Sequence, residues 1–273
     1  MNNYVSLVRY ALTATLCVSL LFACEEPEEE VASTPVSGEL SEAVKSQFRN
    51  LGFNANDIVK EGSNYVVGGD IVITPEAFSD MLSSDPVIVN NPQGEQYRTF
   101  NLVDRRLSTI RVRATDNQTR FLRAVDRAIN NFNALNLTFT MVRVASNQPA
   151  DITIRLSSGN GFLGRAEFPS GGRPGSEVIL DVAAFNGRSD DLAEETTTHE
   201  LGHCVGLRHS DYYDRSLSCG GPATNEGSGG VGAVGIAGTV RFDRASLMNS
   251  CGSITQTNGE FSFYDEVALR ELY

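Results

Sequence analysis

All three histidines of this 273-residue chain lie in one short segment, His199-Glu-Leu-Gly-His203-Cys-Val-Gly-Leu-Arg-His209. On an α-helix, His199 and His203 lie on one face, about 6 Å apart along the axis. Two imidazoles at that spacing are able to bind one tetrahedral metal ion. Gly206 permits the left-handed backbone that ends a helix, so that His209 can return as a third ligand. The segment therefore predicts a helix, a glycine turn and a metal centre.

Glu200 lies on the same helix in a different direction. It is about 100° further round the axis than His199, so its carboxylate can reach a water beside the metal without being a ligand. Three protein ligands leave one tetrahedral position open, which is typical of catalytic zinc sites. The pattern indicates hydrolysis by a zinc-activated water, with Glu200 as general base.

A methionine segment, Ser-Leu-Met248-Asn-Ser250, lies further along the chain, with Met248 39 residues beyond His209. The extended histidine motif followed by a methionine turn is the metzincin signature. In that class, Met248 is expected to form an apolar floor beneath the imidazoles. Several metzincins carry a tyrosine where this chain has Ser250, so no tyrosine is assigned to the transition state.

Shorter stretches narrow this resemblance; they are Gly69-Asp70-Ile71-Val72, Arg111-Val112-Arg113, Gly238-Thr239 and the C-terminal Phe263-Tyr264-Asp265 to Leu272-Tyr273. With the histidine segment they resemble the bacterial dual-action HEIGH metallopeptidase family, with Leu201 replacing the isoleucine of that name. The resemblance extends from about residue 45 to the C-terminus. It implies an α+β metzincin (zincin) fold with a five-stranded mixed sheet, two long helices and a small C-terminal subdomain.

Apolar patterning supports such a fold from residue 97 onwards. Strands are expected over 108–114, 137–144, 151–156 and 177–182, with an edge strand inside the glycine-rich stretch 159–175. A long amphipathic helix is expected over 121–132, and the helix of the metal motif is expected to begin at Asp190. An extended substrate is expected to pair with the edge strand around 165–168.

Residues 38–96 are expected to form a small module before a catalytic domain at 97–273. Apolar residues recur at helical spacing over 40–51, the stretch 65–73 is typical of a strand, and a short helix over 75–82 has Thr74 as its N-cap. The module is either a pro-segment that blocks the cleft or an accessory domain. In the first case Asp70 would cap the zinc, although aspartate is also common in turns and at strand ends.

The N-terminus has the pattern of an export signal. Arg9 precedes an apolar stretch over 10–23 that is too short to span a bilayer. The stretch ends in Leu-Phe-Ala-Cys24, which resembles a lipoprotein lipobox, so removal of residues 1–23 and lipidation of Cys24 are expected. The alternative is an ordinary secretory signal with an incidental cysteine. Residues 24–37 are rich in Glu and Pro and predict a solvated acidic tether.

The formal net charge of −12 argues against a nucleic-acid partner, which requires a basic surface. The expected partners are protein or peptide substrates, together with a membrane contacted through the lipid anchor only. These features predict a monomeric exported lipoprotein on the outer membrane or cell surface of a Gram-negative, Bacteroidetes-like bacterium.

The mature domain beyond the expected lipidation site Cys24 contains an odd number of cysteines, namely Cys204, Cys219 and Cys251. A bridge between Cys219 and Cys251 would tie the glycine-rich loop to the methionine turn and stabilise the fold by about 3–4 kcal/mol on a chain-entropy model. Cys204 points off the metal face of its helix and is expected to be a small buried side chain. Connectivity does not follow from sequence, so pairing of Cys204 with either loop cysteine stays open.

Two other functions fit the same residues. One is a lipid-anchored binding or adhesion protein on an inactive zincin scaffold, although a decayed enzyme is expected to lose Glu200 or a ligand first. The other is a zinc hydrolase that acts on a non-peptide amide, which only an assay separates from a peptidase. The expected cofactor is one catalytic Zn²⁺, and nothing in the sequence supports structural Ca²⁺.

Overall fold

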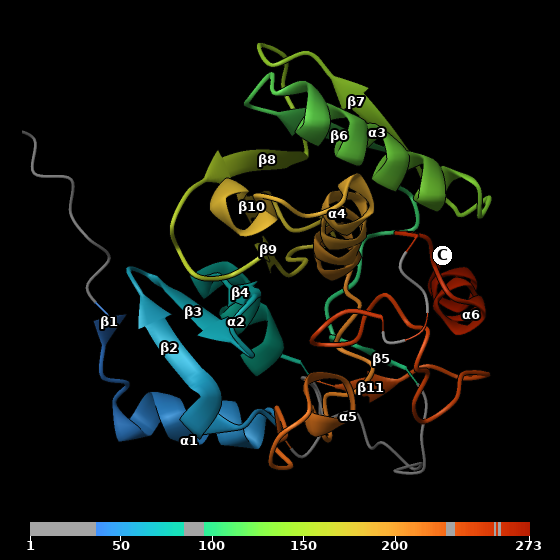
Figure 1. The fold of residues 1–273 in the computed structure, drawn as a ribbon. Helices are drawn as coiled ribbons and strands as arrows, with labels where there is room; N and C mark the ends of the chain where they lie inside the picture. The colour runs from blue at the N-terminus through green and yellow to red at the C-terminus, as the bar shows by residue number, and fades with distance from the viewer. Residues whose placement is uncertain (1–36, 85–95, 228–232, 254, 256–257) are drawn as a thin grey trace, which may run out of the picture. The chain divides into compact units, whose positions relative to one another are not determined.

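A nine-stranded mixed sheet is the main element of the fold (Figure 1). This computed structural model describes residues 37–84, 96–227, 233–253, 255 and 258–273. The strands follow one another across the sheet in the order β1-β2-β3-β4-β9-β10-β8-β6-β7. Their bounds are β1 Ser37–Gly38, β2 Ile58–Glu61, β3 Asn64–Val67, β4 Ile71–Ile73, β6 Thr109–Ala114, β7 Thr140–Val144, β8 Ile152–Ser157, β9 Gly164–Glu167 and β10 Glu177–Asp181.

The expected number of five strands is wrong, because the N-terminal module extends the sheet. Strands β7, β6, β8 and β10 are parallel, and β9 runs antiparallel to β10. Strands β1 to β4 then pair antiparallel with one another, and β4 joins β9 in parallel. The stretch 65–73 is not one strand, since Gly68 and Gly69 take positive φ values of 65° and 96° and turn it into the β3–β4 hairpin. As a consequence, β9 is not an edge strand.

Six α-helices and a second small sheet complete the described fold. The helices are α1 Glu42–Asn50, α2 Pro75–Leu82, α3 Thr119–Asn133, α4 Asp190–Cys204, α5 Ser216–Cys219 and α6 Phe263–Leu272. Two short 3-10 helices span Ala55–Asp57 and Val182–Phe185, and the second sheet pairs β5 Tyr97–Arg98 with β11 Val234–Gly235. The Thr74 hydroxyl accepts the Ala77 N–H, which confirms the expected N-cap of α2.

Two apolar clusters fill the interior. The larger one joins the buried faces of α3, α4 and α6 to strands β6 to β10, and it includes Phe132, Leu201 and Met248. The smaller one is the core of the N-terminal module around Phe48, where α1 and α2 lie beside β2, β3 and β4 (Figure 1). Phe168, which directly follows β9, belongs to this smaller cluster. The module therefore packs on the catalytic sheet next to the strand expected to receive substrate.

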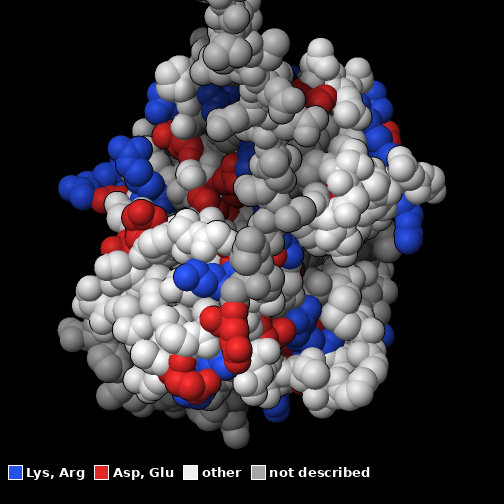
Figure 2. All heavy atoms as spheres, turned by 90° about the vertical axis from the view of Figure 1, so that its left-hand side faces the viewer, with Lys and Arg blue, Asp and Glu red and all other residues white. Residues whose placement is uncertain are grey.

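Part of the sequence prediction lies outside the described residues. This applies to the signal sequence 1–23, Cys24, the 24–37 tether except its last residue, and most of the connection after 84. Within the described ranges, no helix combines the length and the apolar character that crossing a membrane requires. On the face shown in Figure 2, acidic and basic side chains are intermingled between areas of uncharged residues.

Candidate active site

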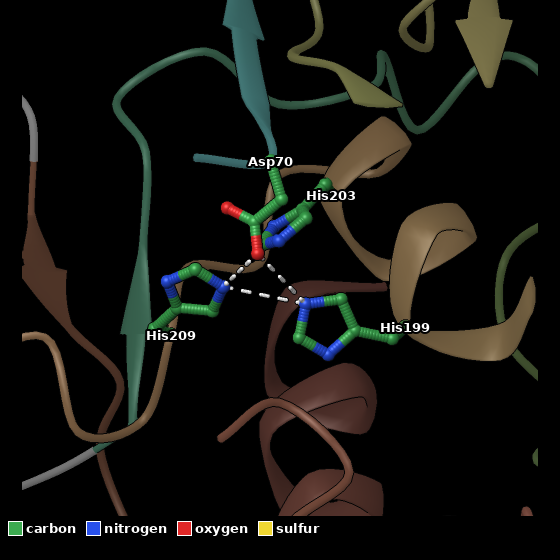
Figure 3. Close-up of side chains that lie close together, drawn as sticks. All are labelled: Asp70, His199, His203 and His209. Atoms are coloured by element: carbon green, nitrogen blue, oxygen red, sulfur yellow. Dashed lines mark hydrogen bonds and ion pairs between the residues drawn. The ribbon is translucent and has the colours of Figure 1, made fainter. Parts of the chain in front are cut away.

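Helix α4 and the turn after it bring the three histidines together. The helix ends at Cys204, and Gly206 then takes a φ of 100°. A Cβ at Gly206 would lie 2.8 Å from Leu102 Cδ2, so the turn requires glycine. The rings of His199, His203 and His209 face one another with centroids 4.6 to 5.2 Å apart (Figure 3).

Each imidazole uses its Nδ1 in a hydrogen bond that orients the ring. The acceptors are the Leu247 carbonyl for His199 at 2.8 Å, the Leu207 carbonyl for His203 at 2.8 Å, and the Glu226 carboxylate for His209. The Nε2 atoms are therefore the free ends of the rings. Those of His199 and His209 are 3.3 Å apart, and the buried Nε2 of His203 has no hydrogen-bond partner among the described residues. Converging nitrogens of this kind fit a metal ion.

Asp70 joins the histidines from the turn before β4 (Figure 3). Its Oδ2 lies 3.0 Å from His209 Nε2 and 3.8 Å from His199 Nε2. One ligand atom from each of the four residues lies within 4.8 Å of the others. Three imidazole nitrogens and one carboxylate oxygen form a donor set suited to Zn²⁺. Asp70 has both positions left open by the sequence, since it lies in the turn before β4 and its carboxylate lies among the three histidines.

Burial and neighbouring charges set the protonation of the rings. Burial lowers the pKa of His199, and that of His203 well below 6.5, which favours the neutral form that binds a metal. Burial acts in the same direction on His209, but the carboxylates of Asp70 and Glu226 outweigh it and raise the pKa of His209 well above 6.5. A metal cation here takes over the positive charge that these carboxylates favour.

Glu200 is buried beside this cluster and is 2% exposed. Burial raises the pKa of its carboxyl well above 4.5, and the charge of Asp70 adds to the rise. Its Oε2 has no hydrogen-bond partner in the described part of the chain. A Cβ on Gly164 of β9 would lie 2.4 Å from Glu200 Oε1, so the glutamate packs directly on the backbone of that strand. This arrangement leaves one carboxylate oxygen free for a proton transfer.

The methionine turn lies under the motif helix and is held there by α6. A Cβ on Gly202 would lie 2.6 Å from Met248 Sδ, so Met248 packs against the middle of α4. Buried Asp265 accepts the Leu247 N–H at 2.8 Å and also caps the first turn of α6 together with Ser262. Sequence reasoning missed this role of Asp265, although the Ser-x-x-Asp spacing of the capping box was a usable signal.

A disulfide and the hydrogen bonds of Ser250 hold the loops next to the methionine turn. Cys219 and Cys251 form a disulfide, and Cys204 is a buried free thiol. The backbone N–H and hydroxyl of Ser250 both donate to Asp211 Oδ1, at 2.9 and 2.8 Å. Ser250 therefore stabilises the loop, and its polar groups are already engaged.

Glu226 is a second functional residue that sequence reasoning missed. It is fully buried and accepts hydrogen bonds from His209 Nδ1 and, at 2.6 Å, from Arg208 Nη2. Burial by itself raises its pKa, but the charges of His209 and Arg208 lower it to about 2. The available signal was that Glu226 is the only acidic residue between positions 215 and 242. It is the partner that orients the third ligand.

Substituting Glu226→Gln is expected to weaken zinc binding by about 10- to 100-fold, because the ligand ring loses its charged acceptor. Competition with a chromophoric chelator measures the affinity. Glu76→Gln is the matched control, since that side chain is exposed in the first turn of α2. Equal zinc affinity in both variants would show that Glu226 does not position His209.

Three nitrogen ligands beside a buried glutamate, with a methionine turn beneath, define a metallopeptidase centre of the metzincin kind. Residues 65–273 match the family described as the dual-action HEIGH metallo-peptidases, and the chain belongs to that family.

Individual relatives are more distant. Serralysin B of Dickeya chrysanthemi is 27% identical over an alignment of 158 residues, with a coverage of 51% of this chain and 30% of serralysin B. The chain thus spans less than a third of that relative. Among solved structures, myroilysin has 16% identity and a TM-score of 0.44, covering 64% of this chain and 96% of its own. High choriolytic enzyme 1 of the medaka fish Oryzias latipes has 17% identity and a TM-score of 0.39, covering 64% and 94%.

Proposed function

We propose that this chain is a zinc-dependent endopeptidase in which Glu200 is the general base. The observation that carries the proposal is the convergence of three ring nitrogens next to a buried glutamate with a free oxygen. A zinc ion held by His199, His203 and His209 supplies a Lewis acid that acidifies water and polarises the scissile carbonyl.

The protein groups divide the remaining chemistry between them. Glu200 accepts a proton from the attacking water and delivers it to the leaving amine, and its raised pKa favours the first of these two transfers. Leu247 and Glu226 keep the Nδ1 atoms of His199 and His209 occupied, so that both Nε2 atoms stay directed at the metal. Because the polar groups of Ser250 are bonded to Asp211, no side chain at that position is assigned to the transition state.

A peptide-library digest tests this proposal. Zinc-loaded protein, incubated until self-cleavage near residues 90–105 has released the N-terminal module, is expected to cleave many peptides. This activity is expected to be lost in 1,10-phenanthroline and to return when zinc is restored, because the ligand set binds zinc reversibly. Mass spectrometry of the products reports each cleavage. Cleavage that persists in the chelator would contradict a metal mechanism. Hydrolysis of acyl amides without any peptide cleavage would favour the non-peptide hydrolase.

We also propose that residues 38–96 are an inhibitory pro-segment. The backbone groups of β9 that a substrate strand would use are taken by β4: Ala166 donates to the Asp70 carbonyl at 2.9 Å, and Phe168 donates to the Val72 carbonyl at 3.1 Å. The Asp70 side chain meanwhile lies against His209, where the attacking water is needed. An accessory domain would not be expected to cover both the substrate-binding side of β9 and the metal-binding cluster.

Ion pairs support this placement of the module. Arg165 of β9 donates to the Gly69 carbonyl at 2.9 Å and forms an ion pair with Glu61 of β2 at 2.7 Å. The guanidinium of buried Arg208 lies over the ring of Phe53, 4.8 Å from its centroid. These contacts hold the β3–β4 turn against the metal-binding cluster.

Export as a lipoprotein is a further proposal, supported by residues 1–37 and consistent with the Cys219–Cys251 disulfide, since such bonds persist outside the cytoplasm. Radiolabelled palmitate is expected to be incorporated into the wild-type protein in cells and to be lost in Cys24→Ala. Labelling that survives this substitution would rule out Cys24 as the anchor.

A further inference from the structure

A cavity of about 710 Å³ opens directly beside the catalytic glutamate. One side is the outer part of α4, with Leu192, Glu195 and Thr196, and the chain after the methionine turn closes another side. Leu163, which precedes β9, also lines it. Because His199 and Glu200 lie in the same wall, a side chain next to the scissile bond would enter this cavity.

Glu195 provides an unsatisfied negative charge in this wall. It is 9% exposed and lies one helical turn before His199. Its Oε1 accepts the backbone N–H of Ser253 at 2.9 Å. No described residue gives a hydrogen bond to its Oε2 or an ion pair to the carboxylate, and burial raises its pKa. A largely buried carboxylate whose second oxygen is open only to a cavity is stabilised by a cation that enters that cavity.

The other charged groups around the cavity already have partners. Arg165 is paired with Glu61 at 2.7 Å, and Arg215 is 3.4 Å from Asp57. Asp70 and His199 belong to the metal-binding cluster described above. Glu200 lies beside that cluster as the proposed base, and its Oε2 has no hydrogen-bond partner among the described residues. Apart from Glu200, Glu195 is the charged side chain among the described lining residues that has no partner of opposite sign.

We propose that Glu195 makes this cavity a specificity pocket for a basic substrate side chain, arginine or lysine, adjacent to the cleaved bond. Apolar lining residues such as Leu192, Leu247 and Phe162 suit the methylene stem, while the free oxygen of Glu195 accepts the cationic head. This assignment rests on the proposed peptidase function, since it names the substrate class of the same site.

Cleavage-site profiling of the zinc-loaded full-length chain is the first test. The wild-type protein is expected to favour Arg or Lys next to the cleaved bond over Gln and Met by at least about tenfold, the value of one charged hydrogen bond. Glu195→Gln is expected to remove this preference and to keep cleavage elsewhere. Asp191→Asn is the matched control, because it removes a charge from the exposed start of the same helix.

A wild-type cleavage profile with no preference for basic residues overturns the pocket proposal, and this result does not require that Glu195→Gln folds. Cleavage at other residues would still support the peptidase function. Retention of the preference in a folded Glu195→Gln protein also overturns the pocket proposal. If no form cleaves any peptide even after the N-terminal module has been released near residues 90–105, the peptidase function has failed. The binding measurement then tests the pocket by itself.

The binding measurement uses p-aminobenzamidine as a cationic probe of the pocket. The protein is the zinc-loaded full-length Glu200→Gln variant, because binding is measured without turnover. The probe is expected to bind, and adding Glu195→Gln is expected to weaken binding at least about tenfold. Competition with argininamide and lysinamide distinguishes a guanidinium preference from an ammonium preference. Equal affinities with and without Glu195 would overturn the proposal independently of catalysis.

Discussion

Replacing Glu200 with glutamine is expected to lower kcat by about 100- to 10,000-fold and to leave zinc in place. The amide has nearly the same volume, so its packing on Gly164 of β9 is preserved. It cannot accept a proton from water, however, and the Asp70 carboxylate lies against His209 through its Oδ2. The effect should appear in kcat, since the zinc ligands and the substrate cavity are unchanged.

Metal content and turnover have to be measured together to interpret this variant. Plasma mass spectrometry of the protein is expected to give one zinc per chain in both forms, while a quenched fluorogenic peptide reports the loss of rate. Asp191→Asn serves as the control, since it lies on the same helix outside the cluster. Proteolysis near the wild-type rate with zinc bound would exclude Glu200 as the base.

Freshly purified Asp70→Ala protein is expected to be more active than the wild-type chain by about tenfold or more. If the module is inhibitory as proposed, only the fraction of wild-type molecules whose Asp70 has left the cluster is competent, and removal of the carboxylate increases that fraction. Pairing of β4 with β9 stays in place in this variant, so full activity is expected only after release of the module. The initial rate on a fluorogenic peptide measures the difference.

Self-cleavage provides the second readout for Asp70. Wild-type protein is expected to be cut slowly near residues 90–105, Asp70→Ala faster, and Glu200→Gln not at all. An Asp70→Ala chain with unchanged zinc content that is no more active than wild type would show that Asp70 does not restrain the site. Zinc content is the necessary check, because Asp70 lies within 4.8 Å of the ligand nitrogens.

Local spacing explains the parts of the fold that the sequence predicts well. The amphipathic helix around Phe121–Phe132, the N-cap at Thr74 and the helix end before Gly206 all depend on neighbours within a few residues. The strands of the N-terminal module were harder to predict from sequence. Two glycines divide one apolar stretch into a hairpin, and the second strand of that hairpin pairs with β9, about a hundred residues away. Loop residues such as Glu226 carry no periodic signal at all.

The three histidines that converge, and the glutamate beside them, were predictable from local sequence. An i, i+4 histidine pair, the glutamate between them and a glycine turn specify the direction of those side chains through helix geometry alone. Three further features became visible only in the fold: Asp70 reaches the same point, Glu226 accepts a hydrogen bond from His209, and Glu195 lines the cavity. The positions of these three side chains depend on contacts between segments that are distant in the sequence. Burial and strand pairing bring such segments together, and the spacing of neighbouring residues does not predict it.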